Sequence, residues 1–279
     1  HVGADDHWLA PDNVQMTPET RVARRTSPTN MGLGLLASLA AYDFGFLGLG
    51  GVISRTAAAL ATMHGLERYR GHFYNWYDTE TLAPLRPLYI SSVDSGNLAG
   101  HLLTLQRGLL ALAQEPVFRV ASIEGLRDTL GVLAQHVADA ERPNLLAWSD
   151  ELLTAMASPP RSMDAVFAFA GSQTDRLRML MPALTRETSD EAAFWLSRLV
   201  AQCDDMTAEA TQWLGAEGQV EGIPTLLQLA NGGSIDAALQ AVAVVRIEAL
   251  GRIAALAGEL AIMDHAFLYD ENRHLMSIG

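Results

Sequence analysis

Lysine is missing from this sequence of 279 residues, and positive charge is scarce. The 19 basic residues are all arginine and are outnumbered by 32 aspartates and glutamates, which gives a formal net charge of −13 at pH 7. Nucleic acids and anionic lipids are bound through clusters of positive charge, which this composition does not provide. We therefore expect no nucleic acid as a partner, and a neutral ligand such as a sugar fits this composition better.

Cysteine is nearly absent, with Cys203 as the only example. A single cysteine excludes an intrachain disulfide and a multi-cysteine zinc site, so a reducing compartment is the default expectation. Asp204 and Asp205 follow Cys203, and their negative charge is expected to raise the thiol pKa and make it a poor nucleophile. No glycine-rich phosphate loop follows a predicted strand, so we expect no nucleotide cofactor, and no other cofactor is indicated.

Long apolar runs are limited to residues 31–52, which are long enough to raise the question of a membrane span. This stretch contains six glycines and, near its middle, Asp43, whose charge is costly inside a bilayer. We therefore predict a buried helix followed by a glycine-rich turn, and no membrane span.

Both ends of the sequence lack the features of a natural terminus. The chain begins with HVGADD, which has no initiator methionine and neither the basic nor the apolar region of a signal peptide. It ends with the residues MSIG and has no polar tail. We expect both ends to be cuts inside a longer protein.

Hydrophobic residues make up 49% of the chain and charged residues 18%, which excludes a disordered protein. Their spacing, interrupted by proline and glycine, predicts an all-α fold. Ser27 and Pro28 are expected to start a helix that runs to about residue 42, and residues 54–69 are expected to form its hairpin partner. Residues 70–93 have no helical period and are interpreted as a long ordered loop.

The remaining helices are predicted between residue 94 and about residue 263. Asp94 or Ser95 is expected to cap the first of them, and Thr188 with Glu191 has the spacing of a capping box for a later one. Residues 267–279 contain two short apolar runs that flank polar residues, which predicts a small β-hairpin.

Three clusters of short polar side chains and aromatic rings interrupt this helical background, at residues 8–15, 25–30 and 75–97. Aromatic rings pack against the apolar face of a pyranose, while carboxylate, amide and guanidinium groups bond its hydroxyls. Capping is the stronger interpretation of a single residue such as Asn30 or Asp94, but the set as a whole favours a binding surface. The predicted sugar-binding residues are Asp12, Asn13, Arg25, Thr26, Asn30, Asn75, Trp76, Tyr77, Asp78, Asp94, Ser95 and Asn97.

Candidates for catalysis and for metal binding are few. Glycosyl transfer uses two carboxylates, about 5–5.5 Å apart for retention and about 6.5–9.5 Å apart for inversion. Asp78 and Asp94 are the only pair at plausible loop positions, and sugar hydrogen bonding explains them equally well. His64 and Glu67 have a spacing found among helix-borne metal ligands. No second such motif exists, so we interpret them as an ion pair at a helix end and expect no metal.

Several longer motifs resemble, in one order, the central domain of bacterial cyclic β-1,2-glucan synthases. They are RTSPTNMGL at residues 25–33 with YDFG at 42–45, GHFYNWYDT at 71–79, and VDSGNLAG at 93–100. The final segment, from FLYD at 267–270 to SIG at 277–279, matches the same domain. The resemblance covers residues 8–106 and 263–279 strongly, whereas the helical stretch between them is similar only in length and character.

This resemblance implies an (α/α)6 barrel of helical hairpins, related to endo-β-1,2-glucanases, within a retaining transglycosylase. Such an enzyme cleaves linear β-1,2-glucan and closes it into a ring. The parent protein of this family is a large bacterial inner-membrane enzyme whose catalytic parts face the cytoplasm. We therefore expect β-1,2-glucan and the other domains of a parent synthase as partners.

The resemblance also implies that the chain is incomplete as an enzyme. The family's two catalytic glutamates follow the segment that matches residues 277–279, so we expect the chain to be inactive alone. Residues 1–106 would form the N-terminal part of the barrel, residues 107–262 a helical segment or insertion, and residues 263–279 the start of the remaining barrel. Two alternatives stay open: a non-catalytic helical interaction module, and an endo-β-1,2-glucanase-type hydrolase.

Overall fold

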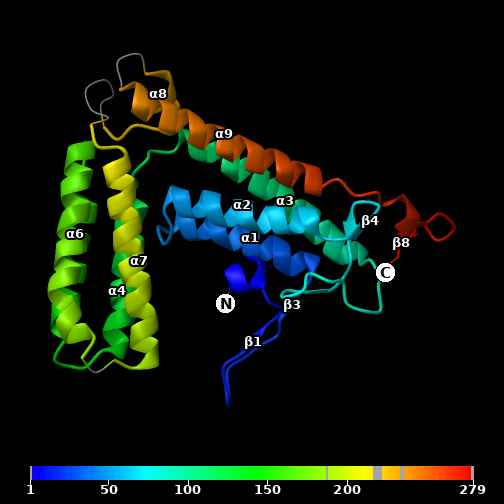
Figure 1. Ribbon diagram of the computed structural model, residues 1–279, viewed down its shortest axis with the longest axis horizontal. Helices are drawn as coiled ribbons and strands as arrows, with labels where there is room; N and C mark the ends of the chain where they lie inside the picture. Colours follow the sequence, from blue (N-terminus) through cyan, green and yellow to red (C-terminus); the bar gives the residue numbers. More distant parts are fainter. Residues whose placement is uncertain (1, 187, 216–221, 233–235, 278–279) are drawn as a thin grey trace. The chain divides into compact units, whose positions relative to one another are not determined.

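The computed structural model describes residues 2–186, 188–215, 222–232 and 236–277, and it is mostly helical (Figure 1). The predicted all-α class is confirmed, because the strands are only two residues long. The α-helices are α1 (Pro28–Asp43), α2 (Leu49–Gly65), α3 (Ser92–Ala111), α4 (Val120–His136), α5 (Arg142–Ala157), α6 (Met163–Leu184), α7 (Asp190–Gln212), α8 (Leu226–Asn231) and α9 (Ala237–Leu260). Short 3-10 helices are η1 (Ala4–Asp6), η2 (Leu112–Gln114) and η3 (Ala266–Leu268).

The strands form separate antiparallel pairs and no larger sheet among the described residues. The pairs are β1 (Val14–Gln15) with β2 (Arg21–Val22), β3 (Arg25–Thr26) with β6 (Tyr77–Asp78), β4 (Arg68–Tyr69) with β5 (His72–Phe73), and β7 (Tyr269–Asp270) with β8 (Leu275–Met276). The last pair confirms the predicted terminal hairpin, with Tyr269 opposite Met276. Residues 278 and 279 of the terminal motif lie outside the described residues.

Packing divides the chain into two compact units. Unit 1 comprises His1–Leu39, Ile53–Leu112 and Ala249–Gly279, and unit 2 comprises Ala40–Val52 and Ala113–Glu248. The predicted domain boundaries at residues 106 and 262 remain predictions.

Unit 1 is built on the neighbouring helices α1, α2, α3 and α9 (Figure 1). Gly32 of α1 lies against His101 of α3, so closely that a methyl group on the glycine would overlap the imidazole. On another side of α3, the Gln106 amide donates a 3.1 Å hydrogen bond to the Ala254 carbonyl of α9. Four leucines of α3 are fully buried in the core: Leu98, Leu102, Leu105 and Leu109.

The beginnings of α1 and α3 and the ends of α2 and α9 lie at one end of unit 1 (Figure 1). Strands β3 to β8 and the loop before α3 gather at this end. The arrangement places all three predicted polar clusters near the same set of helix termini, which is where a site could form.

Unit 2 contains a four-helix bundle formed by α4 to α7. Helix α4 packs against α5 and α7, and α6 packs against α7. Trp148 of α5 connects α5 to α6, because its buried indole Nε1 donates to Gln173 Oε1 of α6 at 2.7 Å. Short connections join consecutive helices and make them antiparallel neighbours.

Several predictions of helix ends are tested by the structure. The start of α1 is confirmed, because the Asn30 amide donates to Ser27 Oγ at 3.2 Å. The predicted cap of α3 was wrong: Ser91 caps this helix and accepts from the Asp94 amide at 3.1 Å. The capping box predicted from Thr188 and Glu191 was also wrong, because Ser189 caps α7 and its Oγ accepts from the Ala192 amide at 3.2 Å.

The apolar stretch 31–52 forms α1, a turn and the start of α2. The glycine-rich turn is confirmed at Gly45, whose φ of +75° is left-handed and whose close approach to Ala121 leaves no room for a methyl group. The predicted buried helix, α1, is buried on one side only: Met31 and Leu35 are buried, whereas Leu33 is exposed. Among the described residues, no helix combines the length and the hydropathy that crossing a bilayer requires.

Candidate functional site

Trp76 lies at the centre of the polar cluster in unit 1. The Arg25 guanidinium stands 4.6 Å from the centre of its ring, which is a cation–π distance. Arg25 in turn donates to Asp12 Oδ2 from Nε at 3.1 Å and from Nη2 at 2.8 Å. Asn30 and Asn13 also donate to the Asp12 carboxylate, at 3.5 Å and 3.1 Å. The Asp12 carboxylate thus accepts from four donor atoms, three of them at Oδ2, and holds the arginine over the indole.

Backbone pairing explains why residues far apart in the sequence meet here. Strand β3 pairs with β6, so that Arg25 lies opposite Asp78 and Thr26 lies opposite Tyr77. The Asp12 amide donates to the Arg25 carbonyl at 2.7 Å, which brings the N-terminal segment to the same strand. The first two predicted clusters are therefore joined to the third through the main chain.

Asn75 connects the tryptophan to the start of α3. In the amide orientation that gives both atoms complementary partners, its oxygen accepts from Trp76 Nε1 at 2.7 Å and from the Tyr89 hydroxyl at 2.5 Å. Its nitrogen then donates to Asp94 Oδ2 at 3.1 Å. Because Asn75 is buried and both its amide oxygen and its amide nitrogen have partners, we interpret it as a residue that positions its neighbours.

Asp94 completes the cluster from the first turn of α3. Its Oδ1 accepts from the Thr29 hydroxyl of α1 at 2.6 Å, and Asn97 Nδ2 donates to the same hydroxyl at 3.2 Å. A continuous set of contacts therefore links Asp12, Arg25, Trp76, Asn75, Asp94, Thr29 and Asn97, which we call the Trp76 cluster.

Besides Asn75, three predicted sugar-binding residues are buried: Tyr77, Thr26 and Ser95. Tyr77 is 0% exposed, and its hydroxyl donates to the Glu67 carbonyl at 2.6 Å. Burial raises the pKa of Tyr77 above its ordinary value. Thr26 is also fully buried, and its hydroxyl has no partner in the part of the chain that the structure describes. The predicted stacking of a sugar on Tyr77 is therefore not available in this structure.

Ser95 is the third buried residue, and it contacts His72. The His72 ring nitrogen Nε2 lies 2.7 Å from the Asp264 carbonyl, which can only accept, so Nε2 carries the proton. Nδ1 then accepts from the Ser95 hydroxyl at 2.8 Å. Burial lowers the pKa of His72 and favours this neutral form. A serine beside a histidine base is a nucleophile geometry, but Ser95 is only 1% exposed and has a structural role here.

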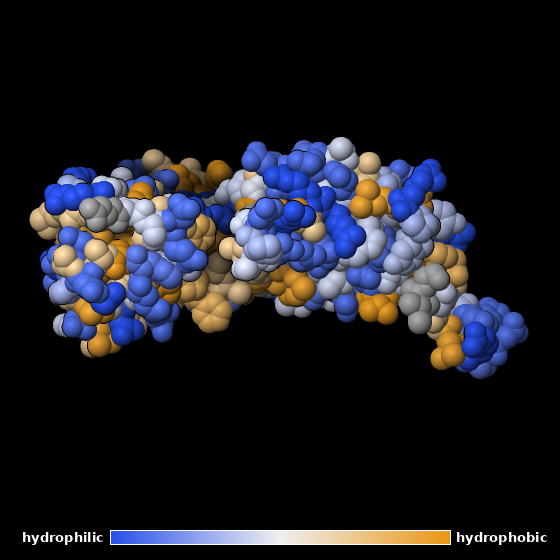
Figure 2. Space-filling model, turned by 90° about the horizontal axis from the view of Figure 1, so that it is seen from below, coloured by the Kyte–Doolittle hydropathy of each residue, from blue (hydrophilic) through white to orange (hydrophobic). Residues whose placement is uncertain are grey.

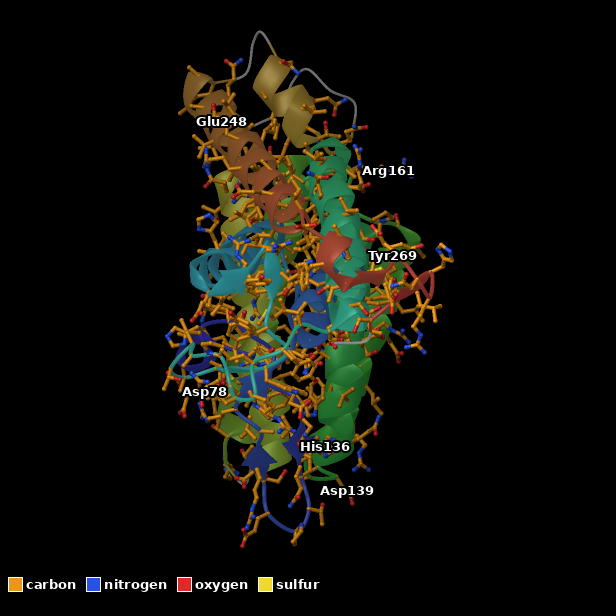
Figure 3. All side chains as sticks on the ribbon, turned by 90° about the vertical axis from the view of Figure 1, so that its right-hand side faces the viewer. Asp78, His136, Asp139, Arg161, Glu248 and Tyr269 are labelled. Carbon is orange, nitrogen blue, oxygen red and sulfur yellow. The ribbon has the colours of Figure 1, made fainter. Side chains whose placement is uncertain are left out.

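Asp78 does not join the Trp76 cluster through its side chain. Its Oδ1 accepts from the amides of Glu80 and Thr81, at 2.9 Å and 2.7 Å, and from the Thr81 hydroxyl at 3.0 Å. Hydrogen bonding from the Thr81 amide, the largest cause, holds the pKa of Asp78 below its usual range. Because these bonds all lie within residues 78–81, the Asp78 carboxylate organises a turn. In Figure 3, Asp78 lies on the opposite side of unit 1 from Tyr269 of the terminal hairpin.

Sequence reasoning missed two members of the site, Thr29 and Tyr89. Thr29 belongs to the quoted RTSPTNMGL motif, but nothing in the sequence shows that it reaches α3. Tyr89 is 42% exposed, and its carbonyl accepts from the Asn75 backbone amide at 3.0 Å. The loop before α3 folds so that Tyr89 and Trp76 both bond the Asn75 amide. In the sequence, the only sign of this second ring is the abundance of aromatic residues in the loop.

The remaining candidates are His64 and Glu67, whose spacing is found among metal ligands, and the thiol of Cys203. Among the described residues, no group of histidine, cysteine, aspartate and glutamate side chains is arranged to hold a metal ion. His64 lies 3.7 Å from Glu259 of α9, so its ion pair joins two helices instead of involving Glu67. Burial, and then the charge of Asp204, raises the pKa of Cys203 to about 12, which confirms that this thiol is a poor nucleophile.

The cluster consists largely of residues from the motifs that resemble cyclic β-1,2-glucan synthases. No family model matches the chain. It is similar over its whole length to a protein of Rhizobium meliloti (strain 1021), Cyclic beta-(1,2)-glucan synthase NdvB, with 31% identity over 296 residues. This match confirms the resemblance and covers 100% of the chain, which spans 10% of the length of that synthase.

Proposed function

We propose that the chain is a segment of a retaining glucan transglycosylase that cleaves linear β-1,2-glucan and closes it into a ring. Within that enzyme, the segment binds the glucan through the Trp76 cluster. The observation that carries this proposal is the set of contacts joining an aromatic ring to Arg25, Asn75 and Asp94 at one end of unit 1. The similarity to the synthase supports the choice of β-1,2-glucan.

The geometry suggests how a glucose unit would be held. Arg25 covers one face of Trp76, so a pyranose would pack on the uncovered part of the indole or on the exposed Tyr89 ring. Asn97 and Asn13 are exposed, and their amides can bond hydroxyl groups. The half-buried Asp12 is fixed by Arg25 and keeps lone pairs to accept from the sugar. Binding groups held by their neighbours before the ligand arrives bind with less loss of entropy.

We propose that the reacting acids are not Asp78 and Asp94. Asp78 accepts three hydrogen bonds in its own turn, and its lowered pKa makes it a poor proton donor at neutral pH. Asp94 accepts from Thr29 and Asn75, which suits a residue that holds the site together. The catalytic pair would come from elsewhere in a longer polypeptide, and this chain alone would lack activity.

The architecture we propose for unit 1 is part of an (α/α)6 barrel, with unit 2 largely an inserted helical segment. Helices α1 and α2 form a hairpin. Helices α3 and α9 pack against each other in the same unit, although residues 112–236 separate them in the sequence. The inserted bundle would contact other domains of the parent synthase. We place that parent at the cytoplasmic side of the bacterial inner membrane.

Calorimetric titration of the 279-residue chain with linear β-1,2-glucooligosaccharides tests the binding function. We expect measurable binding to these chains and no comparable binding to β-1,4-linked oligosaccharides of equal length. Trp76→Ala is expected to weaken binding at least tenfold, which corresponds to about 1.4 kcal/mol. Trp195→Ala is the control, because Trp195 is a half-buried tryptophan of α7 in unit 2.

Two outcomes would contradict the proposal. Unchanged affinity in Trp76→Ala would remove the Trp76 cluster from the binding site. Cleavage of β-1,2-glucan by the isolated chain would show that it carries its own catalytic acids.

A further inference from the structure

A second group of exposed aromatic rings lies at the same end of unit 1. Tyr69 of β4 and Phe267 of η3 are 45% and 38% exposed, and their ring centres lie 5.5 Å apart in an edge-to-face contact. The Arg70 guanidinium stands 5.6 Å from the first ring centre and 5.4 Å from the second. We call these three residues the Tyr69 platform.

Asp264 holds the platform in place. Its carboxylate accepts from Arg70 Nη1 at 3.3 Å, and its amide donates to the Arg70 carbonyl at 3.1 Å. Arg70 has a left-handed φ of 52°, a strained conformation for a residue with a side chain, and Gly71 follows with φ 85°. Gly71 also lies so close to the Ile262 carbonyl that a methyl group there would collide with it. These contacts define the backbone of the turn that carries Tyr69 and Arg70.

A short series of contacts connects the Tyr69 platform to the Trp76 cluster. The Phe267 ring lies 5.4 Å from His72, edge to face. His72 bonds Ser95, and Ser95 follows Asp94, which Asn75 joins to Trp76. A continuous series of contacts within unit 1 therefore runs from one ring cluster to the other.

The chemistry of the platform is that of a carbohydrate contact. Its rings offer apolar surface to the C–H face of a pyranose, while Arg70, Asp264 and the Tyr69 hydroxyl stand beside them for the sugar hydroxyls. Exposed apolar patches with polar margins mark binding surfaces. The net charge of −13 further favours a neutral ligand over an acidic one.

We propose that the Tyr69 platform is a second contact for the same glucan chain and binds glucose units beyond those at the Trp76 cluster. This inference rests on the proposed function. It implies that affinity rises with chain length, because a long glucan reaches both ring clusters whereas a disaccharide occupies one. The second contact adds to the first without a second loss of translational freedom.

Affinity as a function of glucan length tests this inference. The 279-residue chain is titrated with a β-1,2-linked glucose disaccharide and with a linear β-1,2-glucan of about 15–20 units, a length chosen to exceed any single contact. Phe267→Ala and Tyr69→Ala are each expected to weaken binding of the long glucan about fivefold to tenfold and that of the disaccharide less than about twofold. The gentler Phe267→Leu keeps apolar bulk and should lose much of the same long-chain affinity.

Phe194→Ala is the matched control, because Phe194 is a 54% exposed ring of α7 in unit 2. Thermal melting of each variant verifies that it folds. Equal effects on both glucan lengths, or no effect on either, would overturn the inference. Failure of the proposed function looks different: the unaltered chain would bind neither glucan, or Trp76→Ala would leave disaccharide binding intact.

Discussion

Two tryptophans illustrate the contrast between unit 1 and unit 2. Trp148 is fully buried in the bundle of unit 2, and its indole N–H meets Gln173. Trp76 in unit 1 is only half-buried, although its indole N–H meets Asn75 in the same manner. The same hydrogen bond thus serves a hydrophobic core in one unit and holds a ring at the surface in the other. Exposure of the ring, together with the polar groups around it, distinguishes a candidate site from a core.

Paired charges do not make this distinction. In unit 2, Glu209 accepts from Arg246 at 2.6 Å and from the Gly50 amide at 3.2 Å, where it caps the start of α2. In unit 1, Asp12 accepts from Arg25 at 2.8 Å. Both carboxylates are largely buried, but only Asp12 lies beside an arginine that covers a partly exposed indole. In unit 2, Glu209 caps a helix and Arg246 lies over the fully buried Trp213 ring, so this pair belongs to the interior of the unit.

Polar and apolar residues are mixed over the surface on the side shown in Figure 2, so exposure of a single ring there has little meaning for stability. Substitution of the buried Trp148 of unit 2 gives the largest expected effect. Trp148→Ala removes a buried ring and leaves Gln173 without its partner, so unfolding free energy is expected to fall by about 3–5 kcal/mol. Cys203 is buried in α7 of the same bundle, and its thiol should react with alkylating reagents only when the bundle opens.

Urea unfolding and the rate of Cys203 alkylation measure this loss, with Phe194→Ala as an exposed-ring control. Glucan binding is expected to persist in Trp148→Ala under conditions where the helices of unit 1 remain folded. Loss of binding there would break the comparison, because it would make the bundle part of the binding site.

The two amide residues that accept the indole hydrogen bonds give the next effect. Asn75→Ala leaves Trp76 and Tyr89 without their shared hydrogen-bond acceptor and removes the donor to Asp94 Oδ2. We expect about a tenfold loss of glucan affinity, equivalent to about 1.4 kcal/mol, because the ring is no longer fixed. Stability is expected to fall by about 1 kcal/mol.

Gln173→Ala is the matched variant in unit 2, where the same hydrogen bond to a tryptophan is lost. Calorimetric titration should show unchanged glucan binding in this variant, while thermal melting shows a destabilisation of about 1–3 kcal/mol. If both variants altered affinity equally, the distinction between the two tryptophans would fail.

The sequence was sufficient to predict the helical class, the start of α1 and the terminal hairpin, because each depends on local residue patterns. Helix starts that depend on distant groups were not predictable. Helix α2 begins at Leu49, five residues earlier than expected, where Glu209 of α7 accepts from the Gly50 amide. For α3, Ser91 and Asp94 both had capping side chains, and only the backbone at Ser91 shows which one is used.

The candidate site was predictable as a list of residues but not as a surface. Trp76 and Tyr77 are adjacent in a strand region, where successive side chains point to opposite sides. One is therefore half-exposed and the other buried, and their shared aromatic character concealed the difference. Thr29 and Tyr89 enter the site through tertiary contacts with Asp94 and Asn75, which no local pattern records.

Asp78 gives the smallest expected effect and tests whether it belongs to the turn alone. A carboxyl group whose pKa is lowered by folding, as that of Asp78 is, stabilises the folded state at pH values above its unfolded pKa of about 3.9. This contribution is lost as the pH falls through the folded pKa. Asp78→Asn carries no charge at any pH. The difference in Tm between the unaltered chain and Asp78→Asn should therefore be larger at pH 6 than at pH 2.5.

Glucan affinity at pH 6 should be the same in both proteins, because Oδ1 of Asp78 is occupied by Glu80 and Thr81. The amide oxygen of asparagine can accept these same hydrogen bonds, so the turn is preserved and only the charge is removed. A clear loss of affinity in Asp78→Asn would return this carboxylate to the binding surface. It would also show that the turn after β6, and not only the Trp76 cluster, faces the glucan.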